Sequence, residues 1–345
     1  MTKNLDKILL AMSGGVDSSV AVHILKERGF EVVGVTLWLS GDNKNAELAR
    51  QAAETLDIEH IVVDARDEFD AKIIRPFVES YASGSTPNPC IICNPTLKWG
   101  TLIKLADKMS IEKVATGHYA RISGSKILRA EDRKKDQAYF LYRLTDEQLQ
   151  RTVLPIGEFH KDEVRKIAVE LNLAAANRPE SHEICFFERG MLREFLLNSG
   201  VRDQPGDIVD LEGNVIGRHD GWVAYTIGQR QGLGVASSTG RLYVVEINPG
   251  SHKITLGPRS MVMNREFTLT DALFHDKWPV GDERKLGIQI RHMGEELPGK
   301  ITRTDESRAI VLLDRPAFAP APGQSAVFFD GEEVAGGGII SKIED

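Results

Sequence analysis

The sequence predicts an α/β protein, with a doubly wound parallel sheet in its first half and short β-strands in its second half. Apolar runs and amphipathic stretches alternate from residue 7 to residue 122, which is typical of strand–helix–strand units. From about Pro205 onward, Gly, Pro, Asn and Asp interrupt short alternating runs, and no helix of useful length intervenes. The length of 345 residues allows two or three cores.

The elements of the first half follow in a regular order. Strands are predicted at 7–12, 31–39, 58–65 and 114–122, the last with its end at Gly117 and His118, and helices at 16–29 and 45–56. Ligands of such sheets lie beyond the carboxyl ends of the strands. We therefore expect the loop SGGVDSS at 13–19 and the stretch GHYAR at 117–121 to face one crevice.

The second half predicts two groups of strands. Short runs at 205–217, 221–234, 241–250 and 253–258 form the first group, although the glycine-rich YTIGQRQGLG within it is typical of a loop. Runs at 266–274, 285–292, 299–304, 308–314 and 325–340 predict a barrel or sandwich of five to seven strands. Helical segments between Asp136 and Ser199 bridge the halves.

Composition excludes several classes of protein. The chain is 41% hydrophobic and 27% charged, and it contains no apolar run long enough for a membrane span and no signal-peptide pattern. We expect a cytoplasmic protein that does not engage membranes. Three cysteines are an odd count for a disulfide scaffold. The net charge of −7 argues against wholesale coating of nucleic acid but allows a local basic face.

The loop SGGVDSS predicts a phosphate site. Glycines let backbone N–H groups approach an anion, and the following helix N-terminus and serine hydroxyls add donors. No Lys follows the glycines, so this is not a Walker loop. Asp17 is suited to bind Mg²⁺, and the alternative is a Gly-Gly turn with Asp as a helix cap.

The three cysteines form a second candidate site. Cys90 and Cys93 lie just before a helix predicted to begin near Asn94, where the helix dipole would lower a thiol pKa. A redox pair, buried inert thiols, and a zinc site completed by His118 or His182 all stay open. An iron–sulfur cluster held by Cys90, Cys93 and Cys185 is a further alternative.

Seven spaced motifs carry a family resemblance. SGGVDSS is similar to the signature of PP-loop ATP pyrophosphatases. Together with TPNPC..CN..LKWG, GHYAR, KKDQAYFLYRL, PESHEICFF, YTIGQRQGLG and PGQSAVFFDGEEVAGGGII, it resembles bacterial tRNA-specific 2-thiouridylases of the MnmA type over nearly the whole chain. The resemblance implies a PP-loop catalytic domain at 1–200, a small central domain at 201–260 and a tRNA-contacting β-barrel at 261–345. It also implies ATP, Mg²⁺ and tRNA, with sulfur supplied by a persulfide carrier protein or sulfide.

The family's functional residues carry over to named positions. The implied catalytic residues are Asp17, Cys93 and Cys185, with Cys185 carrying a persulfide. The ATP loop corresponds to Ala11, Met12, Ser13, Gly14, Gly15, Val16, Asp17 and Ser18, and further nucleotide contacts to Leu37 and Gly117. The implied tRNA contacts are Asn88, Pro89, Cys90, His118, Lys135, Asp136, Gln137, Arg291, His292 and Gln324.

Two departures from the family pattern concern the sulfur chemistry. Many members have Asp where this chain has Cys90, and the third thiol resembles cluster-dependent thiolases and favours a 4Fe-4S cluster. HEIC replaces the more usual QDIC, which places His182 near Cys185. The competing functions are a small-molecule PP-loop ligase and a noncatalytic RNA-binding module. The basic run from Lys126 to Lys135 is predicted to contact RNA backbone.

Overall fold

The computed structural model of the chain describes residues 5–176, 184–188, 190–235 and 240–343. Two compact units divide the chain. The first comprises Met1–Ile73, Cys90–Phe186 and Glu332–Val334, and the second comprises Ile74–Pro89, Phe187–Gly331 and Ala335–Asp345. In the described part of the chain, no helix is both long and apolar enough to cross a membrane.

A five-stranded parallel sheet organises the first unit, as the sequence predicts. Its strand order is β3-β2-β1-β4-β7. Its strands are β1 (Asp6–Ala11), β2 (Phe30–Trp38), β3 (Glu59–Asp64), β4 (Lys113–Thr116) and β7 (Thr152–Val153). The chain moves from β1 to β2 and β3 on one side and returns to place β4 on the other side of β1. The carboxyl ends of β1 and β4 therefore form the switch point at which such sheets bind ligands.

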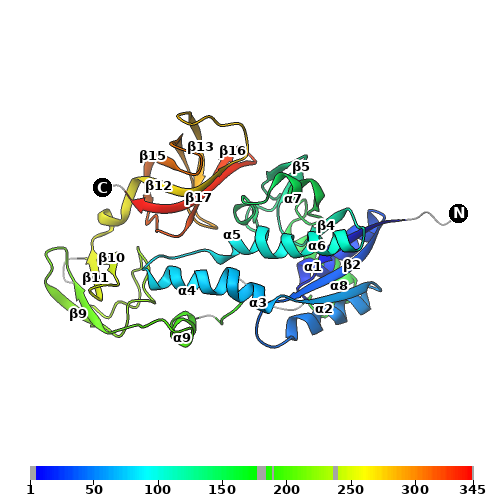
Figure 1. Cartoon of the computed structure of the whole chain (residues 1–345), viewed down its shortest axis with the longest axis horizontal. Helices are drawn as coiled ribbons and strands as arrows, with labels where there is room; N and C mark the ends of the chain where they lie inside the picture. Colours follow the sequence, from blue (N-terminus) through cyan, green and yellow to red (C-terminus); the bar gives the residue numbers. More distant parts are fainter. Residues whose placement is uncertain (1–4, 177–183, 189, 236–239, 344–345) are drawn as a thin grey trace. The chain divides into compact units, whose positions relative to one another are not determined.

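Helices accompany these strands, and Figure 1 shows α1 and α2 beside β1 and β2. A long helical run begins in this unit and continues in the second one. The helices and short strands are α1 (Val16–Glu27), α2 (Lys44–Thr55), α3 (Arg66–Phe69), η1 (Asp70–Ile74), α4 (Arg75–Ala82), α5 (Pro89–Cys93), η2 (Asn94–Trp99), α6 (Gly100–Lys108), β5 (Arg121–Ser123), β6 (Lys126–Leu128), η3 (Ala138–Phe140), α7 (Asp146–Arg151) and α8 (Lys161–Glu170).

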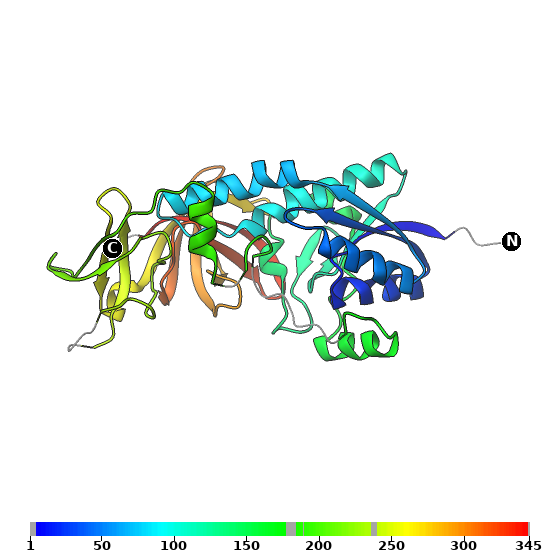
Figure 2. The ribbon, with the colours of Figure 1, turned by 90° about the horizontal axis from the view of Figure 1, so that it is seen from below.

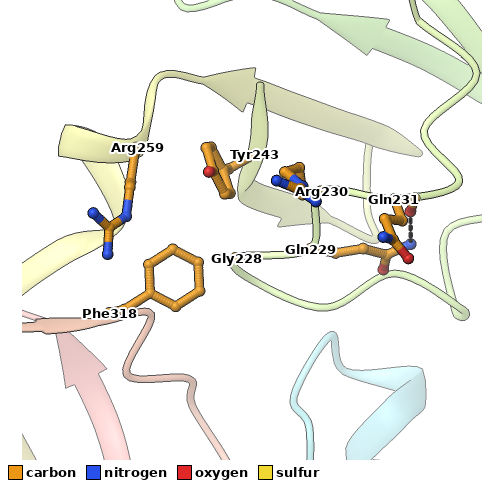
Figure 3. A pocket seen from close by; sticks show the side chains of 7 residues that line it. All are labelled: Gly228, Gln229, Arg230, Gln231, Tyr243, Arg259 and Phe318. Atoms are coloured by element: carbon orange, nitrogen blue, oxygen red, sulfur yellow. Dashed lines mark hydrogen bonds between the residues drawn. The ribbon is translucent and has the colours of Figure 1, made fainter. Parts of the chain in front are cut away.

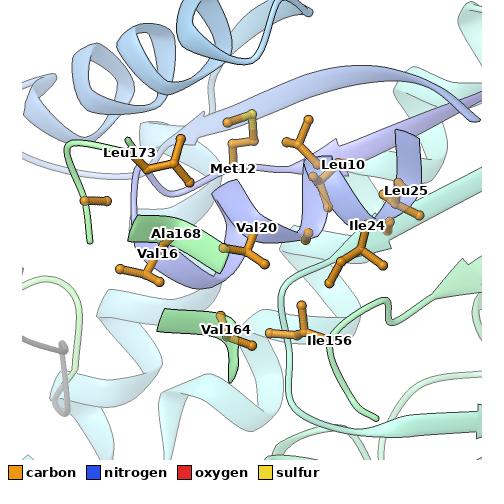
Figure 4. Close-up of a cluster of buried hydrophobic side chains, with 14 of the residues drawn as sticks. Leu10, Met12, Val16, Val20, Ile24, Leu25, Ile156, Val164, Ala168 and Leu173 are labelled. Atoms are coloured by element: carbon orange, nitrogen blue, oxygen red, sulfur yellow. The ribbon is translucent and has the colours of Figure 1, made fainter. Parts of the chain in front are cut away.

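The core of the first unit lies between the sheet, α1 and α8 (Figure 4). Val16, Val20 and Ile24 recur every four residues on α1, which places them on one helical face. Val164 and Ala168 of α8 point toward them, and all five side chains are buried. Burying a side chain of this size contributes about 1.5–3 kcal/mol. The packing therefore fixes where α1 begins, directly after the loop at 13–15.

The second unit contains two β-structures, whose elements are labelled in Figure 1 and drawn in the same colours in Figure 2. A four-stranded sheet has the order β10-β11-β8-β9. The elements are α9 (Leu192–Asn198), β8 (Gly206–Val209), β9 (Val215–His219), β10 (Tyr243–Asn248), β11 (Lys253–Gly257), η4 (Arg259–Val262), β12 (Met263–Phe274), β13 (Glu283–Gln289), β14 (Glu296–Arg303), β15 (Ala309–Phe318), β16 (Ser325–Asp330) and β17 (Glu333–Ile343).

The six C-terminal strands form a closed antiparallel barrel. They run in the order β12-β15-β14-β13-β16-β17, and an additional pairing of β12 with β17 closes the ring. The predicted barrel is confirmed. The described residues 221–234 contain no strand, so the strand run predicted at 221–234 is wrong, whereas the loop interpretation of YTIGQRQGLG within it is confirmed. The division into three domains at 200 and 260 stays a prediction.

Candidate active site

The loop after β1 has a conformation that requires one of its two glycines. Gly14 has a φ of +71°, and a Cβ there would lie 2.6 Å from the Cβ of Leu48 on α2. Gly15 has ordinary backbone angles, and a Cβ there would meet only the Ser13 hydroxyl, at 3.3 Å. The fold therefore needs the first glycine, while the second leaves an open approach to the start of α1.

Serine hydroxyls hold this loop in shape. Ser18 Oγ donates to the carbonyl oxygen of Gly15 at 3.2 Å and accepts from the Ser13 N–H at 3.2 Å. Ser19 Oγ donates to the same carbonyl oxygen at 2.9 Å. The loop is thus internally braced at the N-terminus of a twelve-residue helix, where backbone N–H groups and the helix dipole favour an anion.

Gly117 lies against the same loop, as the sequence predicts. It follows β4, and a Cβ at this position would lie 3.0 Å from the Ser18 nitrogen and 3.1 Å from the Asp17 carbonyl carbon. Leu37 is half-buried near the end of β2. The structure therefore brings together the loop and Gly117 at the switch point of the sheet.

Asp17 has two partners that the sequence analysis missed. Its Oδ1 accepts from Nζ of Lys161 at 2.6 Å and from the hydroxyl of Tyr119 at 2.9 Å. The Lys161 side chain is 9% exposed and the Asp17 side chain 35%. Lys161 begins α8, so a nearly buried ammonium group from 144 residues away is fixed at the candidate phosphate loop. No local signal in the sequence connects these two positions.

The prediction that Cys90 and Cys93 precede a helix is wrong. α5 begins at Pro89, and α5, η2 and α6 follow one another without a break from residue 89 to residue 108. Both cysteines therefore lie inside the helical run. Cys93 is buried, Cys90 is half-buried and Cys185 is exposed, and all three lie in the described residues as thiols rather than disulfides.

The prediction of lowered thiol pKa values is wrong in direction. Burial raises the pKa of Cys93 from 9.0 to about 12, and burial also raises the pKa values of Cys90 and Cys185. Cys185 has solvent access, but the protein around its sulfur still disfavours the thiolate. The charge of Lys98 opposes the rise at all three thiols. Negative charge on Cys185 or Cys90 would raise the pKa of Cys93 further.

The charge of one cation, Lys98, acts on all three thiols. Cys185 comes from a segment far along the chain from α5 and η2, yet its charge acts on Cys93, and Lys98 acts on both. The predicted neighbour His182 lies outside the described residues. Asn94, next to Cys93, is fully buried and donates to the carbonyl oxygen of Phe140 at 3.0 Å. Within the described residues its Oδ1 has no hydrogen-bond donor.

His118 lies beside η2, directly after the residue that contacts the loop. Its Nδ1 is 2.8 Å from the hydroxyl of Thr116, and its ring lies 5.5 Å from that of Trp99 on η2. Burial, helped by the charge of Lys98, lowers the His118 pKa to about 3, so the ring is neutral at physiological pH. Its neighbour Gly117 contacts the phosphate loop. The residues from Thr116 to His118 therefore lie against the loop at one end and beside Trp99 of η2 at the other.

The predicted tRNA contacts at 135–137 have internal partners. Asp136 is buried, and its carboxylate accepts from Arg129 and from two backbone N–H groups. Gln137 Oε1 accepts from the Tyr119 N–H at 2.8 Å. Lys135 is half-buried. Asp136 and Gln137 thus hold the chain around Tyr119, the residue that donates to Asp17.

Much of the basic run at 126–135 is also paired within the first unit. Lys126 Nζ lies 2.6 Å from a carboxylate oxygen of Glu333, and Arg133 pairs with Glu332. These ion pairs neutralise positive charge of side chains that were predicted to contact RNA backbone. Lys134 is exposed.

The remaining predicted tRNA contacts lie in or beside the second unit. Gln324 donates to the carbonyl oxygen of Thr86 at 2.8 Å, two residues before Asn88. Asn88 and Pro89 lead directly to Cys90 at the start of α5. Arg291 is exposed after β13, and His292 is half-buried beside it.

The donor groups of the site limit which metals it can hold. Among the described residues, no group of three or more His, Cys, Asp or Glu side chains is arranged to hold a metal ion. The three thiols therefore do not form a ready cluster site in this conformation. Asp17 offers Mg²⁺ a single carboxylate, which fits the way Mg²⁺ is often held by one carboxylate and substrate phosphates.

Three family models match the chain in succession. They are the tRNA methyl transferase HUP domain at residues 6–189, the tRNA methyl transferase PRC-barrel domain at 193–258 and the aminomethyltransferase beta-barrel domain at 264–340.

Curated relatives match almost the whole chain. The tRNA-specific 2-thiouridylase MnmA of Nostoc punctiforme is 39% identical over 355 residues, covering 98% of this chain and 99% of that protein. That of Carboxydothermus hydrogenoformans is 40% identical over 360 residues, covering 97% and 98%. The bifunctional protein NifU/MnmA of Rubrobacter xylanophilus is 42% identical over 347 residues, covering 97% of this chain and 70% of that protein.

Solved structures are much more distant. A 4-thiouridine synthetase–RNA complex with bound ATP has 16% identity and a TM-score of 0.36, covering 57% of this chain and 50% of that one. A likeness of this size supports no conclusion about activity.

Proposed function

Because the chain belongs to the family of tRNA-specific 2-thiouridylases, we propose that it catalyses the ATP-dependent 2-thiolation of the wobble uridine, position 34, of tRNA. The observation that supports this most directly is that Gly117 lies against the phosphate loop while the next residue, His118, lies beside Trp99 in the helical run that contains Cys90 and Cys93. A loop suited to phosphate and all three thiols therefore belong to one compact unit.

The first step requires activation of an unreactive oxygen. O2 of uridine belongs to a urea-like carbonyl and cannot leave as oxide. In the proposed step, O2 attacks the α-phosphorus of ATP, the P–O bond to the β-phosphate breaks, and pyrophosphate leaves. The loop from Ser13 to Ser18 would bind the pyrophosphate through backbone N–H groups. Lys161 would keep a positive charge beside Asp17 as this negative charge gathers.

The second step replaces oxygen with sulfur. A persulfide on Cys185 attacks C2 through its terminal sulfur, and the C2–O bond breaks to release AMP. Cys93 then attacks Sγ of Cys185, which breaks the sulfur–sulfur bond, frees the 2-thiouridine and leaves a Cys93–Cys185 disulfide. A dithiol reductant must return this disulfide to two thiols, and a persulfide carrier must reload Cys185.

The assignment of roles follows the environments of the two cysteines. Cys185 is exposed, so a macromolecular sulfur donor can reach it. Cys93 is buried and its pKa is raised, so it has to lose its proton before it can attack. Lys98 is the group positioned to favour the thiolate when it forms.

Two cofactor predictions differ in how well the residues fit them. Mg²⁺ would be held by Asp17 together with the ATP phosphates, and when bound it would offset charge on pyrophosphate. A 4Fe-4S cluster on Cys90, Cys93 and Cys185 does not fit the described side chains, because they do not form a metal-binding group. The proposed sulfur transfer therefore uses a persulfide, and no step of it uses a cluster.

The tRNA contacts remain part of this proposal. Asn88, Pro89 and Cys90 would adjoin the target base. Gln324, which holds the segment before Asn88 through Thr86, would position that segment rather than read the RNA itself. Asp136 and Gln137 are proposed to support Tyr119, and Lys134 is the exposed cation of that stretch available to a phosphate.

The test uses purified protein, ATP, a persulfide donor and an unmodified tRNA transcript containing a wobble uridine. Nucleoside mass spectrometry should detect 2-thiouridine, and pyrophosphate release should depend on the tRNA. Asp17→Ala should abolish AMP formation, and a Cys93→Ser/Cys185→Ser variant should retain tRNA-dependent pyrophosphate release but form no thiouridine. Pyrophosphate release from ATP and a small amino acid without tRNA would instead favour the ligase alternative.

A further inference from the structure

The second unit contains a pocket that the proposed function does not use. Its volume is about 480 Å³, which lies in the range of small-ligand sites. It is lined by Gly228, Gln229, Arg230, Gln231, Tyr243, Arg259 and Phe318 (Figure 3). The loop 228–231 is the part of the YTIGQRQGLG motif to which the sequence analysis gave no role.

Two aromatic rings form the apolar part of the pocket. The rings of Tyr243 and Phe318 pack edge to face, with centroids 5.7 Å apart. Phe318 ends β15 and is half-buried, so part of its ring stays accessible. Figure 3 shows both rings directed into the space beside the loop. Tyr243 is buried, so Phe318 offers the accessible ring surface on which an unstacked nucleobase can pack.

Arginines surround these rings. The guanidinium of Arg259 lies 5.5 Å from the Phe318 ring centroid, and that of Arg291 lies 5.6 Å from it. Arg291 also donates to the Phe318 carbonyl oxygen at 2.9 Å. In Figure 3, Arg230 lies on the opposite side of Tyr243 from Arg259. Among the described residues that line the pocket, none is acidic. Its charge therefore complements phosphate.

The loop is shaped before any ligand binds. Gly228 has a φ of +85°, and a Cβ there would lie 2.4 Å from that of Ala319, so only glycine lets the loop approach β15 this closely. The Gln229 side chain accepts from the Thr226 N–H at 3.1 Å and donates to the Gln231 carbonyl oxygen at 3.0 Å. A rigid loop reduces the ordering cost of binding.

We propose that this pocket binds one unpaired nucleotide of the tRNA, with its base packed on Phe318 and its phosphates contacted by Arg230 and Arg259. This inference rests on the proposed function, because it takes tRNA as the substrate. It adds a nucleotide-binding point in the second unit beside Arg291, which is already a predicted tRNA contact. Since packing on a ring requires an unstacked base, the pocket selects single-stranded loops over duplex.

The charge part of the test uses the full chain and an unmodified tRNA transcript, with binding measured at several salt concentrations. Arg230→Gln/Arg259→Gln should weaken binding at least tenfold and reduce the slope of log affinity against log salt by about 1.4, the value for two phosphate contacts. The matched control is Arg218→Gln/Arg308→Gln, which removes two exposed arginines of the same unit. The control should bind like wild type.

The packing part uses Phe318→Leu, which keeps an apolar side chain. This variant should weaken tRNA binding about tenfold. The slope of log affinity against log salt should stay unchanged, because the substitution removes a ring but no charge. Its thermal unfolding is compared with wild type, so that local misfolding is detected. A short single-stranded RNA and the same strand in a duplex serve as further probes, and only the single strand should lose affinity.

The outcomes separate the two claims. If wild type binds and thiolates tRNA but both pocket variants bind like the control, the pocket proposal is wrong and the proposed function stands. If wild type binds tRNA without thiolating it and the variants weaken binding, the pocket proposal stands alone. Equal loss of duplex and single-strand binding in Phe318→Leu overturns the packing claim.

Discussion

The ion pair between Lys161 and Asp17 yields a prediction of measurable size. Exposed pairs contribute about 0–1 kcal/mol, whereas removing one partner of a buried pair costs about 3–5 kcal/mol. The Lys161 side chain is 9% exposed and that of Asp17 is 35%, so this pair lies between the two cases. We expect a coupling free energy of about 2 kcal/mol in a double-mutant cycle of Lys161→Met and Asp17→Asn.

The assay is urea unfolding of the four proteins of the cycle, followed by circular dichroism. The matched control is the exposed pair of Lys7 and Glu31, whose side chains are about half exposed at a distance of 2.8 Å. The Lys7→Met and Glu31→Gln cycle should give a coupling free energy well below that of Lys161 and Asp17, because solvent screens an exposed pair. Lys161→Met should also slow AMP formation, and Lys7→Met should not.

The reasoning would be refuted by a Lys161–Asp17 coupling as small as that of the control pair. Unchanged AMP formation in a folded Lys161→Met protein would separately remove Lys161 from the proposed chemistry. Its remaining role would then be structural.

Three further predictions concern the glycines, the buried thiol and the histidine. Gly14→Ala should lower the melting temperature, because its Cβ would clash with α2, whereas Gly15→Ala should melt like wild type but bind ATP more weakly in a calorimetric titration. Cys93 keeps its proton up to a pKa of about 12 when folded, so stability should fall as pH rises above about 9, where the unfolded chain ionises. Urea unfolding at several pH values should show a shallower fall for Cys93→Ser. The pKa of His118 is lowered to about 3 in the folded protein, whereas the unfolded chain protonates it near pH 6.5. Its contribution to stability is therefore complete above about pH 6.5 and should be lost as the pH falls toward 3. The loss should be smaller in His118→Gln. Equal pH profiles for wild type and variant would contradict either pH prediction.

The predictable part of the fold is the part with local signals. β1, α1 and β2 each show their period within about ten residues, and Gly14 lies where an apolar run meets a helix start. The barrel strands are likewise marked by alternation and turn residues. Their number, six, depends on the pairing of β12 with β17, which no local pattern encodes.

The site was predictable only in outline. The position of Gly117 against Ser18 follows from the general rule for parallel sheets. The start of α5 was misjudged because Pro95 resembles a helix start, while Pro89 is the true one. The thiol pKa values then followed burial, which sequence spacing does not report. Lys161 was missed because its partner lies far away in the chain.

The measurement that most directly tests the central claim follows one oxygen atom. A tRNA transcript is prepared with ¹⁸O at O2 of the wobble uridine and incubated with protein, ATP and a persulfide donor. If O2 is adenylated and then displaced by sulfur, mass spectrometry will find one ¹⁸O in the AMP for each 2-thiouridine formed. Thiouridine accompanied by unlabelled AMP, or by ADP and phosphate, would contradict the account.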